Sequence, residues 1–300
     1  MNYDEYGSIL PDNYEMNLSD FALFLSVMKH KEAYENCLSI IMNEKDLALK
    51  DVHVEEVVLN KSGKRAIRLD AWALDIKQRQ FDMEMQNDTA QDDVRKRSRF
   101  YQGILDTPIL KSGKDTKYRN LPSTVIIFIT QEDIFGQDLA MYTFTEQCEE
   151  IPGLHLDDGT KKLFLNMSSK NGRPELVSLL QYMKKTTLDN PDILVKDQRI
   201  EMLDEIVNEV RQSEEWEAVK MSILEIGLEK GEAIGTQKGE KKKLIQMICK
   251  KVKKNKSLEV IAEELEEDLT VIEPIYRVVV KYGTDSDMEK LYESVESELE

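Results

Sequence analysis

The stretch QFDMEMQ at residues 80–86 decides how this sequence is interpreted. Apolar and polar side chains alternate along it, which predicts a β-strand with two unlike faces. One face is apolar and enters the core, whereas the other carries Asp82, Glu84 and Gln86. An earlier stretch, IRLDAW at residues 67–72, places Asp70 inside another apolar β-rich segment. Carboxylates inside a sheet are costly unless they are paired or bound to a cation, so these two stretches mark a candidate site.

Asp70 and Glu84 are expected on adjacent strands, close enough to share one ligand. Mg²⁺ prefers such carboxylate oxygens, with waters and a substrate phosphate completing its coordination. A divalent cation there would activate a water molecule and neutralise charge on a phosphate in its transition state. The alternative is that Asp82 and Glu84 line the solvent face of an antiparallel strand, because a short D…E-x-Q pattern has many chance matches.

The segments around these stretches predict an α/β domain with a mixed sheet flanked by helices. A three-stranded meander is followed by a helix, a strand buried on both faces, and two further short strands. The predicted strands span 53–59, 65–74, 80–86, 125–130, 141–144 and 162–166, and the predicted helices include 32–42, 91–105 and 175–185.

An all-helical C-terminal region is expected after the break at Asp189-Asn190-Pro191. The resulting organisation is an α/β domain at 1–188, a helical linker at 189–256, a helix-turn-helix-like unit at 257–283 and a mobile acidic tail at 284–300.

Glycines recur at every fourth residue of the expected linker, at Gly227, Gly231, Gly235 and Gly239. They form either a helix whose glycine ridge permits close helix–helix approach, or a frayed segment. An apolar stripe follows at Leu244, Met247, Ile248 and Val252. Ridge and stripe together predict a homodimer through this C-terminal region.

Composition is that of a globular protein, with 41% hydrophobic and 33% charged residues among 300. No apolar run is long enough to span a membrane, so a membrane partner is not expected. The three cysteines form neither a disulfide framework nor a zinc site and fit a reducing compartment, which makes the cytoplasm the expected location.

The net charge of −17 is unevenly distributed along the chain. Residues 95–119 carry eight basic and two acidic side chains, a local +6, and residues 238–256 carry nine lysines and one acid, a local +8. Such a protein can repel DNA globally and bind it at one site. Candidate DNA-binding residues are Arg95, Lys96 and Arg99. The lysine-rich stretch can bind DNA phosphates, lie on an anionic membrane surface or form a solvated helix face.

Arg97 and Tyr101 lie four residues apart on the helix that follows the E-x-Q strand. An arginine on an otherwise apolar stripe usually has a buried anionic partner, here Glu84, Asp70 or a scissile phosphate. The alternative is an arginine that packs its stem and extends its head into solvent.

Several of these segments, taken in order, resemble the PD-(D/E)XK nuclease family transposases, also called Rpn family recombination-promoting nucleases. The matching segments cover roughly residues 18–185: SDF at 19–21, RLD at 68–70, FDMEMQ at 81–86, KRSRFYQ at 96–102, the strand at 125–129, YTF at 142–144, and DDG at 157–159 before LFLN at 163–166.

The resemblance implies a restriction-endonuclease-like core and DNA cleavage that depends on Mg²⁺ or Mn²⁺. It also implies that Asp70 is the metal-binding aspartate, that Glu84 is the second metal-binding acid, and that Gln86 stands where lysine is usual in the wider superfamily. A glutamine can only orient a water molecule, so slow or conditional cleavage is expected. A supplementary helix acid has two candidates, Glu32 and Glu35.

Two functions therefore compete. The first is a metal-dependent DNA endonuclease of low sequence specificity, associated with recombination or mobile-element activity. The second is a catalytically weak or inactive nuclease fold that serves as a DNA-binding or protein-interaction module.

Overall fold

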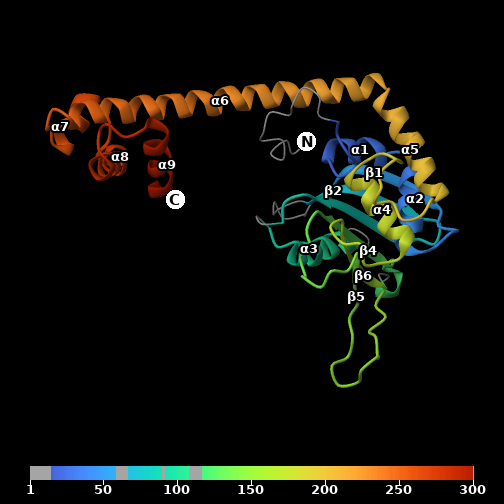
Figure 1. Cartoon of the computed structure of the whole chain (residues 1–300). Helices are drawn as coiled ribbons and strands as arrows, with labels where there is room; N and C mark the ends of the chain where they lie inside the picture. The colour runs from blue at the N-terminus through green and yellow to red at the C-terminus, as the bar shows by residue number, and fades with distance from the viewer. Residues whose placement is uncertain (1–14, 59–66, 90–91, 108–116, 300) are drawn as a thin grey trace. The chain divides into compact units, whose positions relative to one another are not determined.

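The computed structural model describes residues 15–58, 67–89, 92–107 and 117–299 (Figure 1). Its contacts divide the chain into two compact units, with the boundary between Met221 and Ser222. The described residues of the first unit combine a sheet with helices, and those of the second are helical.

Unit 1 is built on a mixed sheet of six described strands in the order β1-β2-β3-β4-β6-β5. Strands β1 to β3 form the predicted antiparallel meander, β3 pairs in parallel with β4, and β4 pairs in parallel with β6. The short edge strand β5 returns antiparallel to β6. The bounds are β1 (Leu49–Val58), β2 (Ile67–Asp75), β3 (Gln80–Gln86), β4 (Thr124–Thr130), β5 (Met141–Phe144) and β6 (Thr160–Asn166).

Helices cover both faces of this sheet (Figure 1). Helix α3 (Val94–Asp106) packs on one face, while α1 (Phe21–Met28), α2 (Lys31–Met42) and α4 (Pro174–Lys184) lie on the other. Because both faces are covered, the central strand β4 is buried along its whole length, as its continuous apolar sequence predicts. The mixed α/β fold class is confirmed.

Helix α5 (Gln198–Arg211) packs on unit 1, although the sequence analysis places it in a linker. Its apolar stripe, which includes Leu203 and Val207, is buried. The Tyr182 hydroxyl of α4 donates a hydrogen bond of 2.8 Å to Asp204. The stripe is thin, but this polar contact and the burial together hold the helix on the domain.

Helix α6 (Glu214–Val252) is continuous and contains all four regularly spaced glycines. The helical alternative is therefore the correct one for this segment. An added Cβ atom at Gly235 or Gly239 would meet no atom within 4 Å, so no described helix approaches these two positions.

Unit 2 packs the C-terminal part of α6 against α7 (Leu258–Leu265), α8 (Leu269–Tyr282) and α9 (Met288–Leu299). Ile245 and Ile248 of α6 share one core with Leu291 and Val295 of α9. Leu244, Ile248 and Val252 of the predicted stripe lie in or against this core and are covered within their own chain, whereas the homodimer through this region stays a prediction. One expectation is corrected by this core. The residues after Thr284 are not a mobile tail, because they contain a packed helix.

Acidic side chains of α7 and α9, and of the turn before α9, form ion pairs with lysines of α6 and of the turn that follows it. The pairs are Lys238 and Lys242 with Glu289, Lys241 with Glu296, Lys253 with Asp285, and Lys251 and Lys256 with Glu264. This pairing removes much of the local positive charge that the sequence offers to DNA or to a membrane surface. Among the described residues, no helix is long and apolar enough to cross a membrane.

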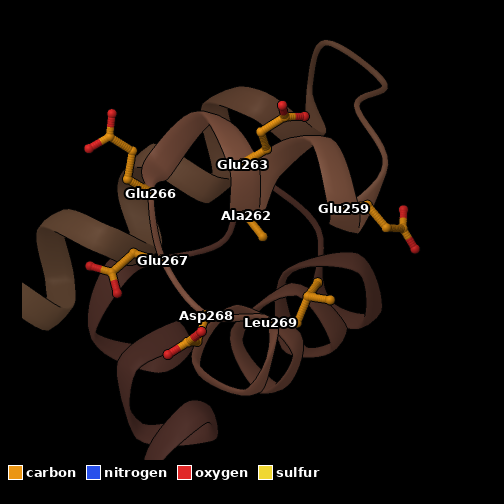
Figure 2. Close-up of a pocket in the computed structure, with 7 residues that line it drawn as sticks. All are labelled: Glu259, Ala262, Glu263, Glu266, Glu267, Asp268 and Leu269. Atoms are coloured by element: carbon orange, nitrogen blue, oxygen red, sulfur yellow. The ribbon is translucent and has the colours of Figure 1, made fainter.

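The turn between α7 and α8 lines an acidic pocket of about 470 Å³. Figure 2 shows its carboxylate side chains around Ala262 and Leu269. The acids are Glu259, Glu263, Glu266, Glu267 and Asp268. Five carboxylates repel phosphates, so this surface of the helix-turn-helix-like pair is unsuited to contact with a DNA backbone.

Val295→Ala is expected to lower the free energy of unfolding of unit 2 by about 2 kcal/mol, because two buried methyl groups are lost and a cavity remains. Val295 is 0% exposed. Urea unfolding of the full chain, followed by circular dichroism, measures the effect, with the exposed Ser297→Ala as the matched control. An unchanged transition in Val295→Ala would show that α9 does not pack in solution.

Candidate functional site

The site forms where strands β2 and β3 separate. Their antiparallel pairing ends at Ala71 and Met83. Beyond that pair, the backbone N–H of Asp70 donates to Glu84 Oε1 at 2.9 Å, and the backbone N–H of Met85 donates to Asp70 Oδ2 at 3.1 Å. Each carboxylate thus accepts a hydrogen bond from a backbone amide that has no backbone partner in the β2–β3 pairing. The structure places the two predicted metal-binding residues side by side.

The separation coincides with a shift in the side-chain alternation of β2. Leu69 and Trp72 pack against the same core cluster under α3, although they lie three residues apart. Arg68 points to the opposite side, where its guanidinium lies 5.8 Å from the centre of the Phe21 ring. A strand that kept strict alternation would place Leu69 and Trp72 on opposite faces. The shift falls at Asp70 and Ala71, which lets the Asp70 carboxylate enter the gap between the strands.

Arg97 of α3 is held inside the site by three hydrogen bonds. Its guanidinium donates to Glu84 Oε2 at 2.9 Å, to Gln86 Oε1 at 2.7 Å and to the Tyr101 hydroxyl at 2.9 Å. It also lies 5.1 Å from the Tyr101 ring centre and 5.6 Å from that of Phe128. The predicted buried anionic partner is confirmed as Glu84, and the solvent-extended alternative for Arg97 is wrong.

Both ends of the Gln86 amide are occupied by protein groups. Its oxygen accepts from Arg97, and its nitrogen donates to the backbone carbonyl of Asp88. From the sequence, this amide is expected to orient a water molecule. In the structure it orients Arg97 instead.

Asp82 is a third carboxyl group in the site, although the sequence does not predict it as a catalytic or metal-binding residue. It is 0% exposed, as is Glu84, so the interpretation of these acids as a solvent-facing row is wrong. No N–H or O–H group of the described residues donates to either oxygen of Asp82. The carboxyl group of Glu84 lies on the same face of β3, and the two groups influence each other's pKa. The period-two spacing of Asp82 and Glu84 is the sequence signal that points to it.

The site has a surplus of negative charge. Burial raises the pKa of Asp82 well above its usual range, and the charge of Asp70 raises it further. Burial and the charge of Asp82 likewise raise the pKa of Glu84, whereas Arg97 lowers it. From α2, burial and the same carboxylates raise the pKa of Tyr34, whose hydroxyl donates to the Ala71 carbonyl at 2.7 Å. Extra protons or a bound cation would relieve this surplus.

Because two carboxyl groups have raised pKa values, the stability of unit 1 is expected to fall as the pH rises. In the unfolded chain both ionise near pH 4, whereas in the folded protein each keeps its proton to higher pH. This contribution to stability is fully present below the unfolded pKa and is lost as the pH rises toward the folded pKa. The slope is at most about 1.4 kcal/mol per pH unit for each retained proton.

Asp82→Asn removes one of these protons and should flatten that slope. Urea unfolding between pH 5 and 8 in the presence of EDTA measures it. Asp51→Asn, at an exposed position of β1, is the matched control and should keep the wild-type slope. Equal slopes in the wild type and in Asp82→Asn would contradict the assignment.

Neither candidate helix acid reaches the site. Glu35 Oε1 accepts from the backbone N–H of Leu49 at 2.7 Å, at the start of β1. Leu49 pairs with Asp75, which lies five residues along β2 from Asp70, about 16 Å at the rise of a strand. Glu32 is exposed. Helix α2 instead contributes the hydroxyl group of Tyr34.

The candidate DNA-binding residues lie on the outer face of α3. Arg95, Lys96 and Arg99 are all exposed, and the first two form ion pairs with Asp93 at 3.2 and 3.6 Å. Helix α3 thus directs Arg97 into the site and three cations toward solvent.

A divalent cation fits the donor chemistry of the site, because carboxylate oxygens are its preferred ligands and Asp82 has two oxygens that receive no N–H or O–H donor. Within the described part of the chain, however, no three His, Cys, Asp or Glu side chains are arranged to hold a metal ion. The protein would therefore supply two carboxylates, Asp70 and Glu84, and water and phosphate would supply the rest. Mg²⁺ commonly binds in this way.

No protein-family model matches the chain, and neither a curated protein nor a solved structure matches it.

Proposed function

We propose that the chain is a metal-dependent DNA endonuclease of low sequence specificity, associated with recombination or mobile-element activity in the cytoplasm. One observation supports it most. The buried carboxyl groups of Asp70, Asp82 and Glu84 meet at a strand separation beside a single described guanidinium, that of Arg97. The adjoining outer face of α3 is basic, as a phosphate backbone requires.

The proposal includes a restriction-endonuclease-like core and membership of the PD-(D/E)XK nuclease family transposases. The order β1-β2-β3-α3-β4, with an aspartate on β2 and an E-x-Q element on β3, supports that assignment. The absence of a base-reading surface on the acidic helix pair of unit 2 supports low sequence specificity.

In this mechanism Asp70 and Glu84 would hold Mg²⁺ or Mn²⁺. When bound, the cation would supply Lewis-acid activation of water and neutralisation of charge on the scissile phosphate. The hydrogen bonds from the Asp70 and Met85 amides fix the two carboxylates. Arg97 orients Glu84 and Gln86 together, and it provides positive charge beside the position where lysine is usual in the wider superfamily.

Relaxation of supercoiled plasmid by the full chain tests the proposal. Nicking is expected with Mg²⁺ or Mn²⁺, and none with EDTA. If the wild type does not nick DNA with any divalent ion, or nicks it equally well in EDTA, the proposed activity is wrong.

The second candidate is an inactive nuclease fold that binds DNA or a protein partner. The contacts of Arg97 favour it, because one guanidinium already engages Glu84 Oε2 and Gln86 Oε1. Calorimetry distinguishes the two functions. An active site should bind Mn²⁺ in an Asp70-dependent manner, whereas an inactive module should bind DNA without any metal dependence.

A further inference from the structure

The connection between β5 and β6, residues 145–159, forms an arm that projects from the sheet of unit 1 (Figure 1). Backbone hydrogen bonds cross its two limbs, from Cys148 to the Leu154 carbonyl at 2.9 Å and from Leu156 to the Glu146 carbonyl at 3.0 Å. The arm is therefore a hairpin whose two limbs are joined by an isolated bridge at Gln147 and His155, although almost all of its side chains are exposed.

The arm combines exposed apolar groups with negative charge. Ile151, Leu154 and Leu156 are 57%, 50% and 62% exposed. The arm contains no lysine or arginine, and its acids are Glu146, Glu149, Glu150, Asp157 and Asp158. Single exposed apolar side chains are ordinary, but three of them within six residues at the tip of an arm indicate a binding surface.

The outer face of α3 has the complementary character. Arg95, Lys96 and Arg99 form a basic stripe, because their spacing of three and four residues makes them neighbours on the helix surface. Phe100, which is 41% exposed, lies beside Lys96 at the edge of this stripe. The face is therefore basic with an apolar edge, whereas the arm is acidic with an apolar tip. The exposure of the arm's apolar side chains shows that the arm of one copy does not cover the α3 face of that same copy.

We propose that the arm of one copy docks on the outer face of α3 of a second copy, and that the second copy returns the same contact. Charge complementarity between the arm and the α3 face, together with their exposed apolar side chains, favours a second copy of the chain as the binding partner. The two reciprocal contacts close a twofold dimer, which does not involve the glycines or the stripe of α6.

The dimer would also regulate the proposed nuclease, and this step rests on the proposed function. Each acidic arm covers the cations that DNA phosphates would contact. DNA and the arm therefore compete for Arg95, Lys96 and Arg99, and the dimer is the resting form.

Charge reversal with light scattering of the full chain tests the contact. Glu146→Lys, Glu149→Lys and Glu150→Lys together change the net charge of the arm from −5 to +1, and Lys96→Glu with Arg99→Glu makes the face acidic. Each variant alone should be monomeric at concentrations where the wild type is dimeric. An equimolar mixture should dimerise again, because both contacts of the mixed pair are then complementary. Glu205→Lys with Glu209→Lys, at exposed positions of α5, is the control and should remain dimeric.

A monomeric wild type would overturn the proposal and leave the arm to another partner or to another part of its own chain. A dimer that survives both reversals, or a mixture that stays monomeric, would overturn it too. Adding duplex DNA separates this proposal from the proposed function. If the arm-dependent dimer persists in saturating DNA, the proposed competition between DNA and the arm is wrong, but the dimer contact is supported. If a monomeric wild type nicks DNA, the proposed nuclease function is supported, but the arm contact is wrong.

Discussion

Asp70→Asn is expected to reduce the rate of metal-dependent plasmid nicking by at least about 100-fold while preserving the fold. The loss of a direct metal ligand should have a larger effect than the loss of a residue that only hydrogen-bonds to a ligand, which typically costs about 10- to 100-fold. Asparagine keeps an oxygen that accepts from the Met85 amide, so the strand separation retains its hydrogen bond. What it loses is the negative charge that a divalent cation requires.

Initial rates of nicking in Mn²⁺, measured beside calorimetric Mn²⁺ binding, check this expectation. Loss of both rate and binding would agree with a metal ligand, whereas loss of rate alone would assign Asp70 a different role. Glu35→Gln serves as the control because Glu35 interacts with the start of β1, away from the site. Equal nicking by Asp70→Asn and the wild type would remove the site from the proposed mechanism.

The sequence predicts the site best where a local pattern determines the structure. Strand β3 has its predicted bounds because strict alternation leaves one register that buries Phe81, Met83 and Met85. The partner of Arg97 is predictable for a similar reason, since a guanidinium on an apolar helix stripe requires an anion nearby.

The sequence fails where burial depends on a distant segment. Asp82 resembles a solvent-facing residue until α3 covers that face of the sheet, which local alternation does not reveal. The sequence does not distinguish Glu35 from Glu32 as the supplementary acid, because the amide that donates a hydrogen bond to Glu35 belongs to β1. Helix α9 is hard to predict from its acidic sequence, since only Leu291 and Val295 form its fully buried stripe.

Arg97→Met is expected to lower the free energy of unfolding of unit 1 by about 3–5 kcal/mol at a pH at which Glu84 is ionised, the usual cost of removing one partner from a buried ion pair. Methionine fills similar space over the Tyr101 and Phe128 rings, so loss of packing is a minor part of the effect. The main cost is Glu84, which remains buried beside Asp82 without its cation.

The second variant, Arg97→Met with Glu84→Gln, should recover much of that loss, because the uncompensated carboxylate disappears with its partner. The single variant should also recover as the pH falls, since Glu84 then becomes neutral and no longer needs the guanidinium. The sign follows from the direction of the pKa shift: Arg97 lowers the pKa of Glu84, so the stability that Arg97 adds is present at high pH and is lost as Glu84 is protonated. Urea unfolding of the three proteins at pH 5 and pH 8 measures both effects. The loss of unfolding free energy in Arg97→Met could be the same at both pH values and unchanged by Glu84→Gln. That result would mean that Arg97 stabilises unit 1 through packing and that other groups balance the negative charge of the carboxylates.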